Sequence, residues 1–110
     1  MSRTLRQYQQ FTRTTAVYPG AGTGSMGAVM YCALEVSDEA GEVAGKLKKL
    51  YRDNKLDKEE LKKEIGDVMW PLARLCDELD MDLQDCLNKN VEKLSDRSTR
   101  GTLQGSGDNR

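Results

Sequence analysis

The chain has 110 residues, enough for one domain with a modest core, because short chains bury proportionally less of their surface than long ones. Charged residues make up 32% of the sequence, yet the formal net charge is only -1. This balance provides no overall field that would favour a nucleic acid polymer or an anionic membrane. Three cysteines without CxxC spacing, together with the lack of histidine, argue against a zinc site.

Aromatic residues are scarce, at 5% of the chain, so the core must be built from aliphatic side chains. A helical domain with so little aromatic mass is expected to complete its core by pairing with copies of itself. The polar start MSRTLRQYQQ does not resemble a signal peptide, and no apolar run approaches the ~20 residues that span a bilayer. These features predict a protein of the reducing cytoplasm without a membrane partner.

The first predicted element is a short helix over roughly residues 5–15, where apolar side chains recur at loosely helical spacing. The segment VYPGAGTGSMG that follows contains a proline and four glycines, so it predicts a loop. Ser25 is a possible N-cap for the next helix.

Two long helices are predicted next. From residue 26 to about 52, apolar residues recur at steps of four and three, namely at Val36, Ala40, Val43, Leu47 and Leu50. Asp57 and Glu60 then form a capping-box-like start for a third helix, whose stripe consists of Leu61, Ile65, Val68, Leu72, Leu75 and Leu79. Pro71 lies inside this helix and predicts a kink near Asp67 rather than a break.

A fourth helix is expected to start at Asp82, with Asp85 in its first turn. After Ser95 the sequence becomes polar and glycine-rich, a composition typical of disorder in isolation. The fold predicted is therefore all-α, a four-helix bundle-type domain completed by oligomerisation. We expect residues 1–97 to form this domain and residues 98–110 to be a polar tail.

Two acid pairs stand out, Glu39 with Glu42 in the second helix and Glu64 with Asp67 in the third. Each pair has i, i+3 spacing, which places both carboxylates on one helix face. Charged helices contain many such pairs on solvated faces, so one pair alone is weak evidence. Each acid, however, directly precedes a residue of its apolar stripe, and two antiparallel helices with facing stripes would bring all four acids to one groove.

Carboxylates gathered in this way repel one another, so a cation should neutralise them. Mg²⁺ fits best and Mn²⁺ is a possible substitute, because hard cations take oxygen ligands. Glu35, one turn before Glu39, could serve as an outer ligand or a base, and Asp38 is a weaker candidate. Basic residues complement the acids: Lys89, Lys93 and Arg97 form a line on the fourth helix that could hold phosphates or be simply solvated.

The segments EAGEVAGKLKK, EIGDVMWPLA, NVEKLSDR and the terminal RGTLQGSGDNR together resemble the MazG-like nucleotide pyrophosphohydrolases, a family of all-α NTP pyrophosphatases. The resemblance spans nearly the whole chain. It implies hydrolysis of a nucleoside triphosphate, often a deoxynucleotide, between the α and β phosphates, and a role in nucleotide-pool housecleaning. It also implies a homodimer or homotetramer.

The resemblance extends to individual residues. Glu39, Glu42, Glu64 and Asp67 match the family's Mg²⁺ ligands, and Glu39 is our choice for a base. Plausible substrate contacts are Lys46, Asn90, Lys93 and Arg97. Trp70 could stack on a base, although a lone tryptophan beside a helical seam more often belongs to a core or an interface. Pro71 departs from the usual pattern, in which the helix continues with an aromatic or aliphatic residue.

Two alternatives remain open from the sequence. Phosphoribosyl-ATP pyrophosphohydrolase shares the fold and has related acidic motifs, and a substrate panel would separate the two activities. A catalytically silent helical dimerisation or nucleotide-sensing module would use the acids only as a solvated face. Such a face predicts no specific effect of Mg²⁺ on activity or melting temperature.

Overall fold

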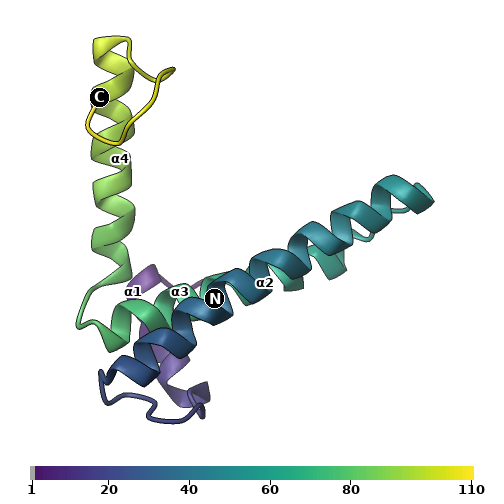
Figure 1. Ribbon diagram of the computed structural model, residues 1–110, viewed down its shortest axis with the longest axis vertical. Helices are drawn as coiled ribbons and strands as arrows, with labels where there is room; N and C mark the ends of the chain where they lie inside the picture. Colours follow the sequence, from purple (N-terminus) through teal and green to yellow (C-terminus); the bar gives the residue numbers. More distant parts are fainter. Residues whose placement is uncertain (1) are drawn as a thin grey trace.

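The computed structural model describes residues 2–110, and these residues form helices and loops without strands. The elements are α1 (Leu5–Thr12), a 3-10 turn η1 (Arg13–Thr15), α2 (Met26–Asp53), α3 (Lys58–Glu78) and α4 (Leu83–Arg100) (Figure 1). The predicted all-α fold is confirmed. None of the helices in the described part of the chain combines the length and apolar character needed to cross a membrane.

Side-chain caps explain where the helices begin. The Ser25 hydroxyl accepts a hydrogen bond from the Ala28 amide at the start of α2, as the sequence predicted. Asp57 caps α3 and Asp82 caps α4 through their carboxylates, again at the predicted positions. α1 has a full capping box between Thr4 and Gln7. Each cap satisfies backbone donors that the first helical turn leaves without partners.

Two of the helices end at a residue whose backbone has the left-handed conformation. Asn54 (φ 53°) follows α2 and Gly101 (φ 75°) follows α4. α4 thus continues past Ser95 into the polar segment, and the Thr102 amide closes its end by donating to the Arg97 carbonyl at 2.8 Å. Glycine tolerates this conformation at no steric cost, which makes Gly101 an effective helix stop.

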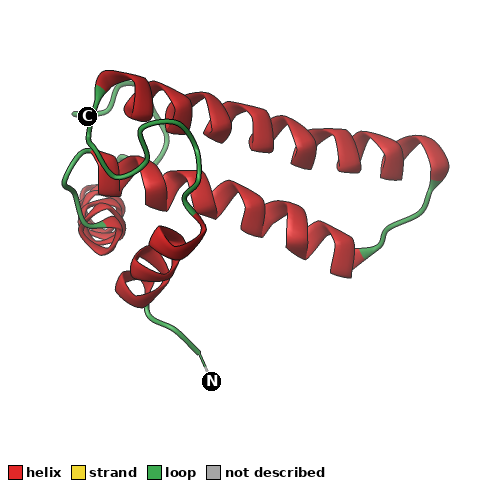
Figure 2. Cartoon of the chain, turned by 90° about the horizontal axis from the view of Figure 1, so that it is seen from below, coloured by secondary structure: helices red, strands yellow, loops and turns green. Residues whose placement is uncertain are grey.

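α2 and α3 lie side by side and antiparallel, joined by residues 54–57, and we call this pair the α2–α3 hairpin (Figure 2). The predicted stripes meet only in part. Val36 and Val43 of α2 and Leu61 and Val68 of α3 are half-buried, whereas Ile65 is 49% exposed. One chain therefore covers part of each stripe and leaves the rest open.

The small apolar core lies where the loop before α2 folds over the C-terminal part of α3. Tyr18, Ala28 and Cys32 are buried there, and Trp70 and Leu75 pack against them. Pro71 is also fully buried, and α3 runs through it to Glu78 without a break. Burial gives this proline a packing role that offsets the backbone hydrogen bond it removes.

A buried polar network holds the loop onto α3. The Glu78 carboxylate accepts hydrogen bonds from the Tyr18 hydroxyl and from the amides of Gly22 at 2.7 Å and Gly24 at 2.8 Å. The Arg74 guanidinium, which is 1% exposed, pairs with Glu78 at 3.4 Å and with Asp77 at 2.7 Å. Buried charges persist only when they are paired and hydrogen-bonded, as these are.

α4 starts against α1 and then leaves the rest of the molecule. Arg6 of α1 pairs with Asp82 at 2.6 Å, and the Gln9 side chain accepts a hydrogen bond from the Leu83 amide at 2.8 Å. Beyond its first turns α4 projects away from the α2–α3 hairpin (Figures 1 and 2). Residues 101–110 fold back beside the end of this helix.

Candidate metal site

Three of the four predicted metal ligands lie together in the middle of the α2–α3 hairpin. Glu39 of α2 and Glu64 and Asp67 of α3 each place a carboxylate oxygen within 4.8 Å of the other two. Glu39 and Glu64 are half-buried and Asp67 is exposed. The antiparallel pairing of the helices produces this arrangement, because it brings the same flank of both stripes to one side.

A second acid group shares Glu39 with the first. Glu35 and Asp38 bring carboxylate oxygens within 4.8 Å of that of Glu39. Glu39 therefore stands between Glu35 and Asp38 of its own helix and the two acids of α3. An oxygen-only donor set of this kind suits a hard divalent cation that keeps several waters.

Glu42, the fourth predicted ligand, belongs to neither group. Its side chain is exposed on α2, one turn nearer the hairpin connection than Glu39. It stays close enough to Glu39 to contribute to the electrostatics of that carboxyl. Its role as a ligand remains a prediction.

Lys46 and Tyr8 border the acids. The Lys46 ammonium lies 3.9 Å from the Glu64 carboxylate, so this predicted substrate contact is next to the acid group. Tyr8 of α1 is half-buried, and both its burial and the nearby Asp67 charge raise the pKa of its hydroxyl. The place of Tyr8 beside the acids was not predictable from the sequence, because helical spacing within α1 does not reveal where that helix packs.

The crowding of acids shows most clearly in the pKa of the Glu39 carboxyl. Burial raises the pKa of the Glu39 carboxyl, and the charges of Asp67, Glu35, Asp38 and Glu42 raise it further. All of these causes disfavour the ionised form. A bound divalent cation would reverse the balance, since it would neutralise the same charges.

This electrostatic cost predicts a pH-dependent stability difference between the metal-free wild type and Glu39→Gln. A raised carboxyl pKa means that the folded state holds a proton that the unfolded state has lost, so the wild type loses stability as pH rises above 4.5 through the raised pKa. We therefore expect Glu39→Gln to melt at a higher temperature than wild type at pH 7 in chelator. The difference should shrink toward pH 4.5.

Thermal melts of both proteins across this range, with excess chelator, measure the effect. Glu92→Gln, which removes an exposed carboxylate of α4, is the matched control and should show little pH-dependent difference. Adding Mg²⁺ should raise the melting temperature of the wild type more than that of Glu39→Gln. A constant difference between wild type and Glu39→Gln at all pH values would contradict the electrostatic account.

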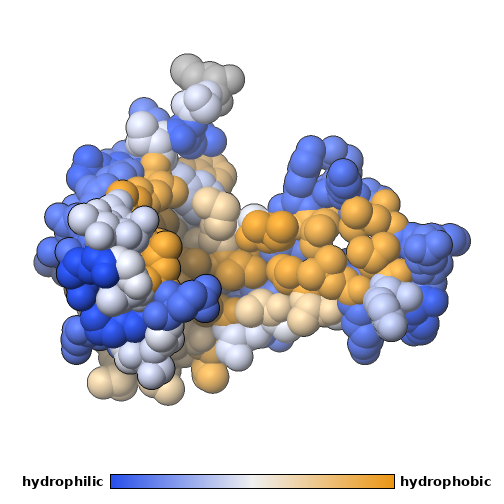
Figure 3. Space-filling view, turned by 90° about the horizontal axis from the view of Figure 1, so that it is seen from above, coloured by the Kyte–Doolittle hydropathy of each residue, from blue (hydrophilic) through white to orange (hydrophobic). Residues whose placement is uncertain are grey.

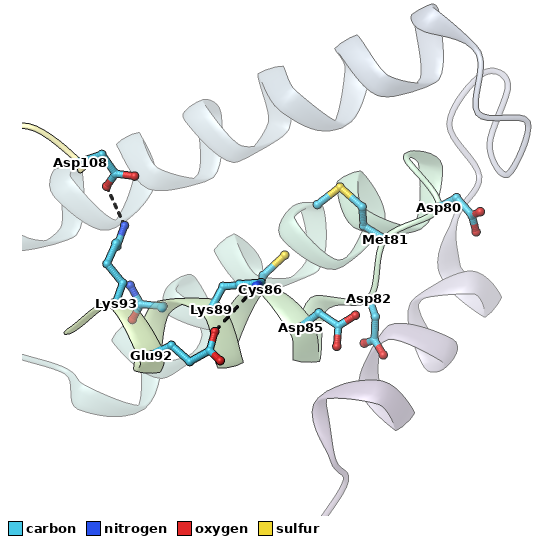
Figure 4. A pocket seen from close by; sticks show the side chains of 10 residues that line it. Asp80, Met81, Asp82, Asp85, Cys86, Lys89, Glu92, Lys93 and Asp108 are labelled. Atoms are coloured by element: carbon cyan, nitrogen blue, oxygen red, sulfur yellow. Dashed lines mark hydrogen bonds and ion pairs between the residues drawn. The ribbon is translucent and has the colours of Figure 1, made fainter. Parts of the chain in front are cut away.

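The basic line on α4 lies apart from the acids in the described chain, because α4 projects away from the hairpin (Figure 1). Two of its members are already engaged. The Lys93 ammonium pairs with Asp108 at 2.8 Å, and the Arg97 guanidinium donates to the Asp108 carbonyl (Figure 4 shows the Lys93 pair). Arg97 is only 5% exposed, so the tail covers it.

The remaining predicted substrate contacts have different surroundings. Asn90 is exposed and lines an open cavity of about 1010 Å³ beside α4, together with Lys89 and Lys93. Trp70 packs against the core instead: its indole N–H donates to the Thr15 hydroxyl at 2.7 Å and its ring meets Tyr18 edge-on. The sequence favoured a core or an interface position for Trp70, and this packing is of the first kind; its role as a substrate contact remains a prediction.

Comparisons with known proteins agree with the all-α fold. Residues 31–101 match the family model of the MazG nucleotide pyrophosphohydrolase domain. The chain is also 42% identical over 109 residues to the Gene 37 protein of Mycobacterium phage L5, and the aligned region covers 94% of this chain and 96% of that protein. No solved structure matches the chain.

The matched region contains both acid pairs and all of α4, and it extends over more than half of the chain. The chain therefore belongs to the MazG nucleotide pyrophosphohydrolase family. The resemblance noted in the sequence is confirmed.

Proposed function

We propose that the chain is a Mg²⁺-dependent nucleoside triphosphate pyrophosphohydrolase. It cleaves ribo- or deoxyribonucleoside triphosphates to the monophosphate and pyrophosphate, and it serves nucleotide-pool housecleaning in the cytoplasm. Mn²⁺ could replace Mg²⁺. The observation that carries this proposal is the convergence of the Glu39, Glu64 and Asp67 carboxylates in a chain of this family.

Each residue would have a defined task. Glu39, Glu64 and Asp67, with Glu42 nearby, would hold the cation, which supplies a site of positive charge for the substrate phosphates. Lys46, whose ammonium lies 3.9 Å from the Glu64 carboxylate, would contact a phosphate oxygen. Glu39 belongs to both acid groups, so we assign it the role of base.

A panel of ribo- and deoxyribonucleoside triphosphates, assayed for pyrophosphate release with Mg²⁺ and with excess chelator, tests this proposal. Release that requires the metal supports it and ranks the bases. Phosphoribosyl-ATP belongs in the same panel, since cleavage of that compound alone would favour the related biosynthetic activity. Release of pyrophosphate from none of the compounds would contradict the enzymatic proposal.

We further propose that the active form is a homodimer or homotetramer. Figure 3 shows a broad apolar surface along the α2–α3 hairpin. Exposed apolar side chains of α2 include Met30 (50%) and Leu34 (65%), and those of α4 include Leu87, Val91 and Leu94. Contiguous apolar surface of this kind is typical of an interface, and a second copy offers the same stripes to cover it.

A second copy would also explain how the basic line reaches substrate, since α4, which carries Lys93, projects away from the α2–α3 hairpin, which carries the acids. We expect Lys93→Ala to raise KM for the nucleotide with a smaller effect on kcat, because it removes a phosphate contact and leaves the acids in place. Steady-state kinetics measure this change. An unchanged KM would argue against the basic line as a phosphate site.

Mixing two impaired variants locates the site between chains. Glu39→Gln and Lys93→Ala chains, unfolded and refolded together, should recover part of the activity at low nucleotide concentration if one copy supplies the acids and the other supplies Lys93. Each variant refolded alone is the control. No recovery in a mixed oligomer would place both groups of residues in the same chain.

A further inference from the structure

Two of the three cysteines lie together at the joint between α3 and α4. The Sγ atoms of Cys76, in the last turns of α3, and Cys86, in the first turn of α4, are 3.8 Å apart. The turn between the helices holds them there, because the Met81 amide donates to the Cys76 carbonyl at 2.8 Å and Asp82 caps α4. Two thiols in contact across a tight turn need only a small adjustment to form a disulfide.

The two thiols differ in access. Cys76 is buried, at 7% exposed, whereas Cys86 is half-buried and lines the open cavity of about 1010 Å³ beside α4. Figure 4 shows the Cys86 sulfur pointing out of α4 toward the end of α3. A small molecule in this cavity can therefore reach Cys86 first.

The pKa of Cys76 also indicates that Cys86 reacts first and Cys76 second. Burial, and after it the neighbouring Cys86 sulfur, raise the pKa of the Cys76 thiol to about 11. A thiol with so little thiolate at neutral pH is a poor first attacker, because the thiolate is the nucleophile. Once Cys86 carries an oxidised sulfur in contact with Cys76, proximity compensates for the small thiolate fraction.

We propose that Cys76 and Cys86 form a reversible intramolecular disulfide when the protein meets a low-molecular-weight disulfide. The Cys86 thiolate attacks one sulfur of that disulfide, breaks its S–S bond and releases one small thiol. The Cys76 thiolate then attacks the Cys86 sulfur of the mixed disulfide and releases the second small thiol. The two protein thiols are oxidised, the small disulfide is reduced to two thiols, and the two protein protons end on those products.

This disulfide would fix the orientation of α4 relative to α3. α4 is held to the remainder of the chain mainly at its start, through the Arg6–Asp82 pair and the Gln9 hydrogen bonds. A covalent link between Cys76 and Cys86 would fix the direction in which α4 leaves α3. It would thereby fix the position of Lys89, Lys93 and Arg97, and it would stabilise the fold by constraining the unfolded chain.

Mass spectrometry of the full chain tests the proposal without any assay of activity. Reduced protein is incubated with oxidised glutathione, and its intact mass is measured under non-reducing conditions. We expect the loss of one pair of hydrogen atoms with no retained glutathione, reversed by dithiothreitol. Trypsin leaves both cysteines in one peptide between Arg74 and Lys89, so cleavage after Glu78 is the informative digestion. The resulting fragments should stay joined until they are reduced.

Three variants check the order of the steps. Cys76→Ser should retain glutathione on Cys86, Cys86→Ser should stay largely unmodified, and Cys32→Ser, which removes a buried thiol of the separate core, should behave like wild type. Circular dichroism confirms that each variant is folded, and Cys76→Ala replaces Cys76→Ser if the serine variant is not. The melting temperature should rise on oxidation in wild type and Cys32→Ser only.

Several outcomes of these experiments would contradict the disulfide between Cys76 and Cys86. Wild-type protein that ends with glutathione on Cys86, or with disulfides between chains, would overturn the proposal. A link that involves Cys32 would do so too. Because the wild-type digest needs no substitution, the proposal stays testable even where a variant fails to fold, and its outcome is separate from that of the proposed enzymatic function.

Discussion

Glu39→Gln and Asp67→Asn should each lower turnover by more than about 100-fold, since even residues that merely orient a metal ligand change affinity or activity by ~10–100-fold. Each substitution keeps the shape of the side chain and removes one charge from the group that Glu39, Glu64 and Asp67 form. The loss should appear in kcat, because the residues act on the reacting phosphates through the cation they would hold.

The control for these variants is Glu59→Gln, which changes an exposed acid in the first turn of α3, away from the acid group. It should leave both kcat and KM near their wild-type values. The thermal melts of Glu39→Gln and Asp67→Asn in chelator should show intact folds, because neither residue is buried in the core. Wild-type turnover in both site variants would contradict the assignment of the metal site.

Glu78→Ala should lower the free energy of unfolding by about 3–5 kcal/mol, the range expected when one partner of a buried ion pair is removed. The substitution leaves the Arg74 guanidinium without its Glu78 partner and two loop amides, those of Gly22 and Gly24, without their acceptor. Burial by itself raises the pKa of the Glu78 carboxyl. The hydrogen bonds from Tyr18, Gly22 and Gly24 and the charge of Arg74 outweigh burial, so the pKa is lowered on balance. The native state thus favours the ionised carboxylate.

Denaturant unfolding of wild type, Glu78→Ala, Arg74→Ala and the double variant measures this network. The double variant should cost less than the sum of the single variants, because the two residues share one interaction. Glu92→Ala, which truncates an exposed acid, should change stability by less than about 0.5 kcal/mol. A loss below about 1 kcal/mol in Glu78→Ala would show that the network does not hold the loop.

The helices were predictable because local signals determine them. Apolar spacing placed α2 and α3, and short polar side chains marked the starts at Ser25, Asp57 and Asp82. The proximity of Glu39 to Glu64 and Asp67 also followed from the sequence. A short connection implies antiparallel helices, and the position of each acid beside its stripe then determines which side it occupies.

The buried network was beyond the sequence because charged residues are expected on the surface. Arg74 and Glu78 lie among apolar residues of α3. Their partners Tyr18, Gly22 and Gly24 belong to the loop before α2, and only the packing of this loop over α3 reveals that these residues meet. Tyr8 was missed for a similar reason. Its proximity to Asp67 depends on how α1 packs on α3.

The position of α4 is the largest feature that sequence patterns did not determine. Lys89, Lys93 and Arg97 were identified as a basic line, yet the direction of the helix depends on the turn at residues 79–82 and on contacts with α1. The tail contributes as well. Asp108 meets Lys93 and Arg97 only because left-handed glycines such as Gly107 (φ 86°) turn the tail back toward α4.

The most direct test of the proposed function is product analysis by phosphorus NMR. The wild-type protein is incubated with Mg²⁺ and the triphosphate that releases most pyrophosphate in the panel, or with an equal mixture of the deoxyribonucleoside triphosphates if none stands out. Cleavage between the α and β phosphates predicts the nucleoside monophosphate and pyrophosphate in equal amounts, absent in chelator and in Glu39→Gln. Nucleoside diphosphate with orthophosphate as the products, or intact triphosphate throughout, would contradict it.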